Sequence, residues 1–392
     1  MKMRTVTAWG AALGAVAVLT FIQTARRGRA AETSSPVRVG DFRLTGPYVC
    51  DNLTIFLVHG EDRIKSSSIL TLQEALDQHK AVVHETGNVN ELSIENLSRE
   101  ADVFVQSGDI VKGGQQDRIM AIDLIVPPAR AGQKPVATPI AAYCVEAGRW
   151  QQRGNEAPAQ FAASSAAVPG KDLEVAAKAA ITAGIRTGGV AGAGMRTARG
   201  RSALDVLGAD DAGGAGGSAT GQQGVWQGVS ALQTKLQKNL NARVNAADSP
   251  SSLQLTLETP AVKEAAKKYA KTLSDIVQKA PDVIGFVFAL NGELNSAEIY
   301  GCHALFMKLW PKLLQSSAIE AVAEAPKTTK PAPIGIDRVA RYFSDATSGK
   351  SVSRDLSPRV TIAVLETDKN ILFETRDRAR KDAWIHRSYL TK

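Results

Sequence analysis

Residues 283–300 read VIGFVFALNGELNSAEIY, and this stretch decides the class of fold that the chain can adopt. Two strand-like runs, Val283–Leu290 and Glu293–Tyr300, flank the dipeptide Asn291-Gly292. Asn-Gly readily adopts the two positive φ angles of a tight two-residue turn, so the stretch predicts a β-hairpin. Because helical patterns surround this hairpin, we predict an α+β fold, with helices plus a β-hairpin in the C-terminal half.

The helices expected around the hairpin show apolar residues at helical spacing or a proline at the first helical position. They are a helix that contains Leu232, Leu236 and Leu240, a helix from Pro260 that ends before Pro281, and a helix over residues 303–325 that Pro311 kinks or divides.

The N-terminal half shows short β-branched or apolar runs that Gly, Asn and Pro separate. The expected strands are Leu53–Val58, Ala81–His84, Glu91–Asn96, Asp102–Gln106, Arg118–Val126 and Ile140–Glu146. One helix interrupts them, because Thr71 and Glu74 form a capping box ahead of Leu72–Gln78. Many short strands with turns between them predict an antiparallel sandwich- or barrel-like sheet in this half.

Composition divides the chain further. We expect a main domain over residues 37–325, which contains a mobile Gly/Ala-rich insertion at about 187–222 and a helix at Lys171–Arg186. The insertion has too few apolar residues to bury a core of its own. Residues 326–335 are Pro-rich and predict a linker. The tail, residues 336–392, contains a second hairpin, Val360–Leu365 with Ile371–Thr375, and we expect the tail to dock on the main domain.

The first thirty residues resemble a targeting segment. Lys2 and Arg4 precede an uncharged run over residues 5–25, and small residues follow at a cleavage position before Ala31. This arrangement predicts a secretory signal, so we expect export to the periplasm or the extracellular space. The alternative is a membrane anchor formed by residues 5–25, because the run approaches the length that spans a bilayer. Membrane contact is expected only through this segment if it is not cleaved.

Charge and composition limit the partners. The net charge is +8, but five of the basic residues lie within residues 1–30, so the remainder is only mildly basic and we expect no nucleic-acid partner. Cys50, Cys144 and Cys302 are too few for a disulfide scaffold, and their pairing stays open. The five histidines lack metal-ligand spacing, so we expect no metal site and no cofactor. The oligomeric state stays open.

The densest polar motif is GDIVKGGQQDR, residues 108–118, between two predicted strands. Two glycines permit close approach of the backbone to a ligand. A second motif is CVEAGRW, residues 144–150, where a strand ends in a turn. Arginine suits the recognition of carboxylate or phosphate, and tryptophan offers a stacking face. The candidate ligand-binding residues are Lys112, Gly113, Gly114, Gln116, Asp117, Arg118, Glu146, Arg149 and Trp150. Buried hydrogen-bond pairing within the core is the competing interpretation, and Cys144 is a weak candidate nucleophile because no histidine lies near it in sequence.

Six segments in order resemble the ARG and rhodanese-phosphatase-superfamily-associated protein domain, in which ARG denotes ADP-ribosylglycohydrolase. They are GPYVCDNLTIFLV, LTLQEAL, NVNELSIEN, GDIVKGGQQDR, CVEAGRW and QGVWQGV. The resemblance covers about Gly46 to Ala325, and it implies that GGQQDR and CVEAGRW form one site. The family name records association with enzymes of ADP-ribose and phosphate chemistry, so it implies no particular reaction.

These features lead to three functional hypotheses. The first is a binding module for a small anionic or sugar-phosphate-like ligand at the two motifs. The second is a hydrolase of phosphoester or glycosidic bonds in which Asp117 or Glu146 acts as the acid or base. The third is a structural or interaction protein with no ligand.

Overall fold

The computed structural model describes residues 36–65, 68–88, 90–147, 161–178, 216–278, 280–326 and 332–392. Its largest element is a nine-stranded sheet in which every neighbouring pair is antiparallel. In spatial order the strands are β1 (Val37–Val39), β2 (Phe42–Cys50), β3 (Leu53–His59), β13 (Val283–Leu290), β14 (Glu293–Tyr300), β18 (Ala383–Thr391), β17 (Asn370–Asp377), β16 (Val360–Glu366) and β15 (Lys350–Asp355). The sheet therefore combines strands from both ends of the described chain.

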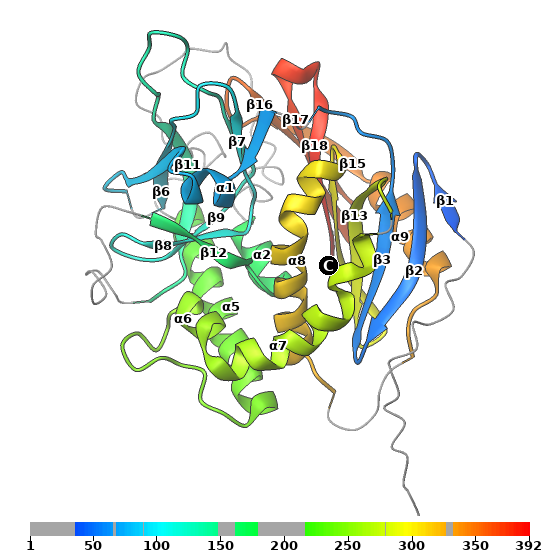
Figure 1. Cartoon of the computed structure of the whole chain (residues 1–392). Helices are drawn as coiled ribbons and strands as arrows, with labels where there is room; N and C mark the ends of the chain where they lie inside the picture. The colour runs from blue at the N-terminus through cyan, green and yellow to red at the C-terminus, as the bar shows by residue number, and fades with distance from the viewer. Residues whose placement is uncertain are drawn as a thin grey trace, which may run out of the picture.

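Two smaller sheets lie on the other side of the molecule (Figure 1). The six-stranded antiparallel sheet has the order β12 (Phe161–Ala167), β8 (Asp109–Gly113), β9 (Arg118–Met120), β11 (Thr138–Cys144), β6 (Glu91–Asn96) and β5 (Ala81–Glu85). The three-stranded sheet has the order β10 (Leu124–Val126), β7 (Asp102–Val105) and β4 (Ile69–Thr71). In that sheet β4 runs parallel to β7, whereas β10 is antiparallel to it.

Helices fill the space between the sheets and cover one outer face. The described helices are α1 (Leu72–Asp77), α2 (Lys171–Ala177), α5 (Gly216–Leu240), α6 (Leu253–Glu258), α7 (Pro260–Leu273), α8 (His303–Ala323) and α9 (Ile336–Thr347), with short 3-10 turns η3 (Ser274–Val277) and η4 (Arg378–Arg380). Figure 1 shows α8 in the middle of the molecule, with the large sheet on one side and the smaller sheets on the other. It is buried along most of its length, as expected of a helix enclosed by sheets.

Helix α9 covers the opposite face of the nine-stranded sheet. Its buried residues, among them Val339, Tyr342 and Phe343, fall on one face of the helix. They pack with Phe42 and Trp384 from the sheet in a separate hydrophobic cluster. Since helices cover both faces, the central strand β13 is buried at every position, which matches its unbroken apolar sequence.

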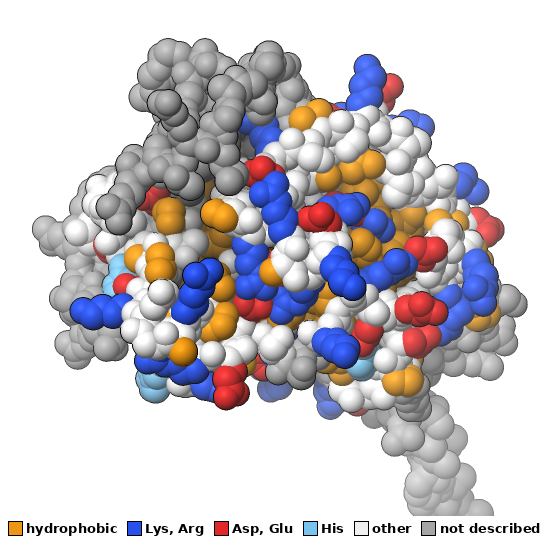
Figure 2. All heavy atoms as spheres, turned by 90° about the horizontal axis from the view of Figure 1, so that it is seen from above, with side chains coloured by type: hydrophobic (Ala, Val, Ile, Leu, Met, Phe, Trp, Pro, Cys, Tyr) orange, Lys and Arg blue, Asp and Glu red, His pale blue; other side chains and the backbone are white. Residues whose placement is uncertain are grey.

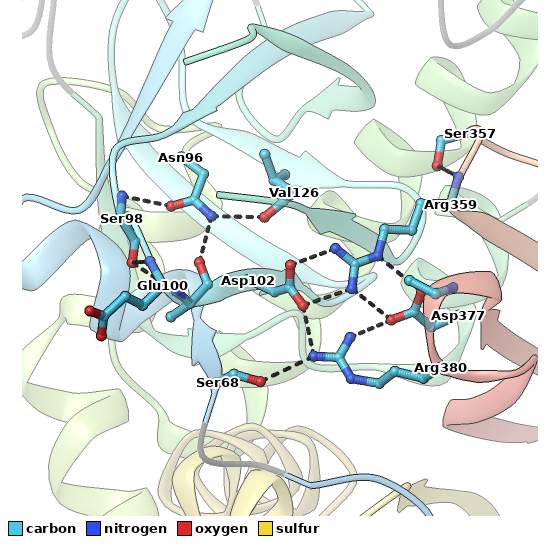
Figure 3. Close-up of polar contacts among 12 residues, drawn as sticks. Ser68, Asn96, Ser98, Glu100, Asp102, Val126, Ser357, Arg359, Asp377 and Arg380 are labelled. Atoms are coloured by element: carbon cyan, nitrogen blue, oxygen red, sulfur yellow. Dashed lines mark hydrogen bonds and ion pairs between the residues drawn. The ribbon is translucent and has the colours of Figure 1, made fainter. Parts of the chain in front are cut away.

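A network of charged side chains joins the C-terminal strands to the three-stranded sheet (Figure 3). Asp102 on β7 accepts two hydrogen bonds from Arg359, at 2.5 and 2.7 Å, and one from Arg380 at 2.7 Å. Asp377 at the end of β17 also accepts from Arg359, at 2.9 and 3.0 Å, and from Arg380. The two arginines and two aspartates therefore alternate around one ring of contacts.

The α+β prediction is confirmed: strands dominate the N-terminal half, and the helices lie largely in the C-terminal half. The hairpin at residues 283–300 has its predicted two-residue turn, with φ angles of 53° at Asn291 and 79° at Gly292. The capping box is also confirmed, because Thr71 Oγ1 accepts from Glu74 N at 3.1 Å and Thr71 N donates to Glu74 Oε2 at 3.0 Å.

Several local predictions are wrong. The single strand predicted at Arg118–Val126 is two strands, β9 and β10, in different sheets, because residues 121–123 break the run. The predicted loop at residues 108–118 contains strand β8. The insertion predicted at 187–222 is helical from Gly216, since α5 begins there. Of the two alternatives predicted at Pro311, a kink or a division, the division does not occur, because α8 continues through Pro311 as one helix.

Other expectations lie outside the described residues. These are the targeting segment at residues 1–30, the insertion at 187–215 and the end of the helix predicted to reach Arg186. Within the described part of the chain, no helix has the length and apolar character needed to cross a membrane.

Candidate functional site

The GGQQDR motif forms the turn that joins β8 to β9. Gly114 has a φ of 57°, which disfavours side chains other than glycine. A Cβ at this position would lie 2.4 Å from the Phe161 ring and 2.7 Å from Glu85 Oε1. The second glycine of the pair is therefore required by close packing of the turn against β5 and β12, and this requirement needs no ligand to explain it.

Asp117 ties this turn to two other elements. Its side chain has 0% exposure. Oδ1 accepts from Gly113 N at 3.1 Å, and Oδ2 accepts from Ser252 Oγ, at the start of α6, at 3.4 Å. The carbonyl oxygen of Asp117 accepts from Val145 N at 3.1 Å. The predicted proximity of the GGQQDR and CVEAGRW motifs is thus present in the described backbone.

Arg118 is also buried, with 1% exposure. Its guanidinium donates to Gln116 Oε1 at 3.3 Å and to Glu85 Oε2 at 3.5 Å, while Nε has no hydrogen-bond partner among the residues that the structure describes. Both contacts are long for a charge-assisted hydrogen bond. Glu85 is one of several carboxylates that the sequence offers for acid–base chemistry, but no sequence pattern placed it beside this turn; its contact with Arg118 comes from the pairing of distant strands.

The remaining motif residues divide between this cluster and its surroundings. Glu146 has 0% exposure and, with Glu85 and Arg118, acts electrostatically on Cys144. Burial is the main cause that raises the pKa of the Cys144 thiol, so a nucleophilic thiolate is disfavoured there. Lys112, by contrast, is partly exposed and bonds Glu258 Oε1 on α6 at 2.9 Å. Arg149 and Trp150 lie outside the described residues.

A cavity of about 40 Å³ lies elsewhere, between α2, α8 and the hairpin β13–β14. We call it the inner cavity. Phe286 and Phe288 on β13 form apolar wall, and their rings stack with centroids 5.9 Å apart. Its charged lining consists of Lys171, Glu174, Glu298 and Glu320. An apolar wall with a few polar groups is typical of sites that orient a small ligand.

A wider cavity of about 370 Å³, the outer cavity, adjoins the inner one. The two share Gly170, Lys171, Asn295 and Glu320 in their linings. Helix α5, the hairpin turn and the end of α8 form the other walls of the outer cavity. The shared lining residues show that the two cavities are adjacent.

Asn295 and Glu320 lie where the cavities meet. Asn295 Nδ2 donates to Glu320 Oε1 at 2.8 Å, and Lys171 N donates to the same oxygen at 3.1 Å. Asn295 is 9% exposed, and no described residue forms a hydrogen bond with its Oδ1. Burial, more than any other factor, raises the pKa of Glu320, and the neighbouring Glu174 and Glu324 raise it further.

Behind the inner cavity, His386 connects two buried carboxylates. His386 Nε2 lies 2.6 Å from Glu298 Oε2, and Nδ1 lies 2.8 Å from Asp123 Oδ2. Burial alone would lower the pKa of His386, but Asp123 and Glu298 outweigh it and raise that pKa to about 10. His386 is therefore an imidazolium at neutral pH.

The two carboxylates beside His386 differ in acidity. Burial opposes ionisation of Asp123, but His386, Thr375 and Ser107 N stabilise its charge and lower its pKa to about 2. Glu298 faces another carboxylate, Glu174, so burial and that charge raise its pKa despite the bond from His386. Asp123 is therefore ionised at neutral pH, whereas the raised pKa of Glu298 makes this carboxylate the easier of the two to protonate.

The charged groups form no metal centre: among the described residues, no set of three or more His, Cys, Asp or Glu side chains has the arrangement of a metal site. Figure 2 shows that Lys and Arg side chains lie beside Asp and Glu side chains on the face of the molecule seen from above. On that face, the described side chains form a mixed surface of both signs.

We compared the chain with known protein families. A family model described as the ARG and Rhodanese-Phosphatase-superfamily-associated Protein domain matches residues 41–390. The chain belongs to this family. The ARG and Rhodanese-Phosphatase-superfamily-associated Protein domain thus extends beyond residue 325, where the resemblance from motifs ended, and it includes strands β15–β18. No curated protein and no solved structure matches the chain.

Proposed function

We propose that the protein binds a small polar ligand, rich in hydrogen-bond donors, in the inner and outer cavities. The observation that carries the proposal is Asn295 Oδ1, a buried acceptor that has no hydrogen-bond partner in the described part of the chain and belongs to a side chain that lines both cavities. An unsatisfied buried polar group costs about 1–3 kcal/mol. A ligand hydroxyl or amine that donates to this oxygen would remove that cost on binding.

The test is a thermal-stability screen with ribose, glucose, glycerol, ethanolamine and ADP-ribose. A ligand present at about one hundred times its Kd stabilises the native state by about 2.7 kcal/mol. We expect at least one donor-rich compound to raise the Tm of the wild type and Asn295→Leu to lose that shift. Asn239→Leu is the matched control, because Asn239 bonds carbonyl groups of α8 but lies outside both cavities. The proposal fails if no compound stabilises the wild type, or if Asn295→Leu responds as the wild type does.

A second candidate is the anion site predicted at GGQQDR. Arg118 supports it, since its guanidinium forms two long contacts and its Nε has no acceptor among the described residues, so donors remain for an anion. Against an open pocket, Asp117, Arg118 and Glu146 are almost completely buried and line neither cavity. Burial of this kind favours the structural interpretation of the motif.

Sulfate and ADP-ribose titrations test this second candidate. Arg118→Gln should lose the anion-dependent rise in Tm, whereas the exposed Arg99→Gln should keep it. Hydrolysis by Asp117 or Glu146 stays a prediction of the sequence; it requires turnover that Asp117→Asn removes. Export through residues 1–30 is likewise a proposal, which cell fractionation of the full chain tests.

A further inference from the structure

The carboxylates of the inner cavity differ in how their charge is neutralised. Glu174 lies 2.5 Å from Lys178 Nζ, and Glu298 bonds the imidazolium of His386. Within the described part of the chain, the hydrogen bonds to Glu320 come from neutral donors, Asn295 Nδ2 and the backbone N–H of Lys171. Among the described residues it forms no ion pair. A buried carboxylate without a cation is costly, so it either takes up a proton or binds a cation.

Lys171, which lines both cavities, does not supply the cation that would neutralise Glu320. Lys171 Nζ donates to Thr391 Oγ1 on β18 at 2.9 Å, so its ammonium group is directed to the sheet. Lys235, on the wall of the outer cavity, pairs with Glu324 at 2.5 Å. Neither ammonium group therefore bonds Glu320.

Two side-chain amide oxygens on the cavity walls form no hydrogen bond with the described residues, so each can accept one from a ligand. Asn295 Oδ1 lies on the side chain that bonds Glu320, and Asn291 Oδ1, on the outer wall, also has no hydrogen-bond partner. The outer cavity includes Ala323 and Glu324 at the end of α8. A helix C-terminus carries partial negative charge, which adds to the preference for a cation.

Size restricts which part of a ligand can reach Glu320. An enclosed water needs about 10–15 Å³, so the inner cavity of about 40 Å³ holds a group of only a few heavy atoms. The outer cavity of about 370 Å³ accepts the larger part of a ligand. Phe286 and Phe288 supply aromatic wall around the head group, and aromatic rings are favourable neighbours of organic cations.

We propose that the ligand is an organic cation, whose ammonium or guanidinium group enters the inner cavity and binds Glu320 and Asn295 Oδ1. This inference rests on the proposed function, because it names the ligand class for the same cavities. It makes Glu320 the specificity-determining residue: the carboxylate selects a charged head group over a neutral hydroxyl of the same size.

Ethanolamine and ethylene glycol provide the test, since they differ only in the exchange of an ammonium group for a hydroxyl. Binding to the full chain is measured at constant ionic strength by ligand-observed NMR and by the rise in Tm. We expect ethanolamine to bind saturably and ethylene glycol to show no shift at the same concentration. Glu320→Gln keeps the shape and should weaken ethanolamine binding at least tenfold, whereas the exposed Glu264→Gln should leave it unchanged.

Equal binding of the two compounds would overturn the inference, as would unchanged binding in a folded Glu320→Gln variant. The comparison of the two compounds on the wild type decides the matter even if that variant does not fold. If neutral sugars or glycerol bind in an Asn295-dependent manner and ethanolamine does not, the proposed function survives and only the cation is wrong. If nothing in either experiment binds, both proposals fail.

Discussion

His386 Nε2 lies 2.6 Å from Glu298 Oε2, so a carboxylate that lines the inner cavity is bonded from behind by a buried imidazolium. The two residues sit on the adjacent strands β18 and β14. The other ring nitrogen bonds Asp123 Oδ2, which belongs to the break between β9 and β10. Charged contacts of His386 therefore connect the nine-stranded sheet to the segment between β9 and β10.

Replacing His386 should destabilise the protein strongly. His386→Asn leaves two buried carboxylates without their shared cation, so we expect a loss of about 3–5 kcal/mol in the free energy of unfolding at pH 6. The exposed His79→Asn is the control, and it should change stability little. Urea denaturation measures both. Equal effects of the two substitutions would show that the His386 contacts are not formed.

The pH dependence of this effect has a definite sign. The pKa of His386 is about 10 in the folded state, above its ordinary value of 6.5. Its contribution to stability is therefore fully present below pH 6.5 and is lost as the pH rises through about 10. The difference in the free energy of unfolding between wild type and His386→Asn should therefore become smaller as the pH rises from 6.5 to about 10. A difference that is constant from pH 6 to pH 10 would contradict the buried imidazolium.

The arginine–aspartate network in Figure 3 gives a second prediction. Asp102→Asn removes the charge that both Arg359 and Arg380 bond, and we expect a loss of about 3–5 kcal/mol because the pair is mostly buried. Asp355→Asn is a matched control, since Asp355 also pairs with an arginine but is 55% exposed; it should cost less than about 1 kcal/mol. If both variants unfold at the same urea concentration, the network does not fasten β7 to the C-terminal strands.

Acid should weaken the same network. Burial alone would raise the pKa of Asp377, but Arg359 and Arg380 outweigh burial and lower it below its ordinary value of 3.8. The stabilisation from Asp377 is therefore present above pH 3.8 and is lost as the pH falls through the lower folded-state pKa. A Tm that does not fall in this acid range relative to Asp377→Asn would be inconsistent with the network.

Gln222 tests whether α5 docks on the six-stranded sheet. Its Oε1 accepts from Cys144 N at 2.9 Å, and its Nε2 donates to Cys144 O at 2.7 Å. Gln222→Ala should cost about 1–3 kcal/mol, because it leaves the backbone of Cys144, the last residue of β11, without these two bonds. The neighbouring Gln223 is exposed, so Gln223→Ala should be nearly neutral. Similar urea midpoints for both variants would place Gln222 outside this contact.

Local signals account for what the sequence predicted well. The Asn291-Gly292 turn and the Thr71–Glu74 capping box each depend on contacts within a few residues, so the pattern contains the whole explanation. The strand prediction over residues 118–126 failed for the opposite reason. Asp123 is one polar residue in an otherwise largely apolar run, and the sequence does not show that the strand breaks there. The break is explained by its bonds to Ser107 N and His386, contacts that only the tertiary structure supplies.

The cavities could not be predicted in the same way. His386 and Asp123 are 263 positions apart, and Asn295 meets Glu320 only because β14 packs against α8. No spacing rule connects such residues. The helix at Ile336–Thr347, by contrast, was predictable from the sequence. Its apolar residues Ile336, Val339 and Phe343 have helical spacing. The GGQQDR motif was found by its polarity, although most of its polar side chains are buried.

Glu320 gives the last prediction, which needs no ligand. Burial raises the pKa of this carboxyl, so the folded protein retains a proton that the unfolded chain has already lost. Folding stability should therefore decrease as the pH rises from the ordinary value of 4.5 through the higher folded-state pKa. Glu320→Gln cannot ionise, so the variant should gain stability relative to wild type over that interval and keep the gain at higher pH. Tm measurements from pH 4 to pH 9, with Glu264→Gln as the exposed control, follow this difference. A variant that is less stable than wild type throughout would show that the Glu320 carboxylate is stabilised by a cation already within the chain, which would also remove the basis for a cationic ligand.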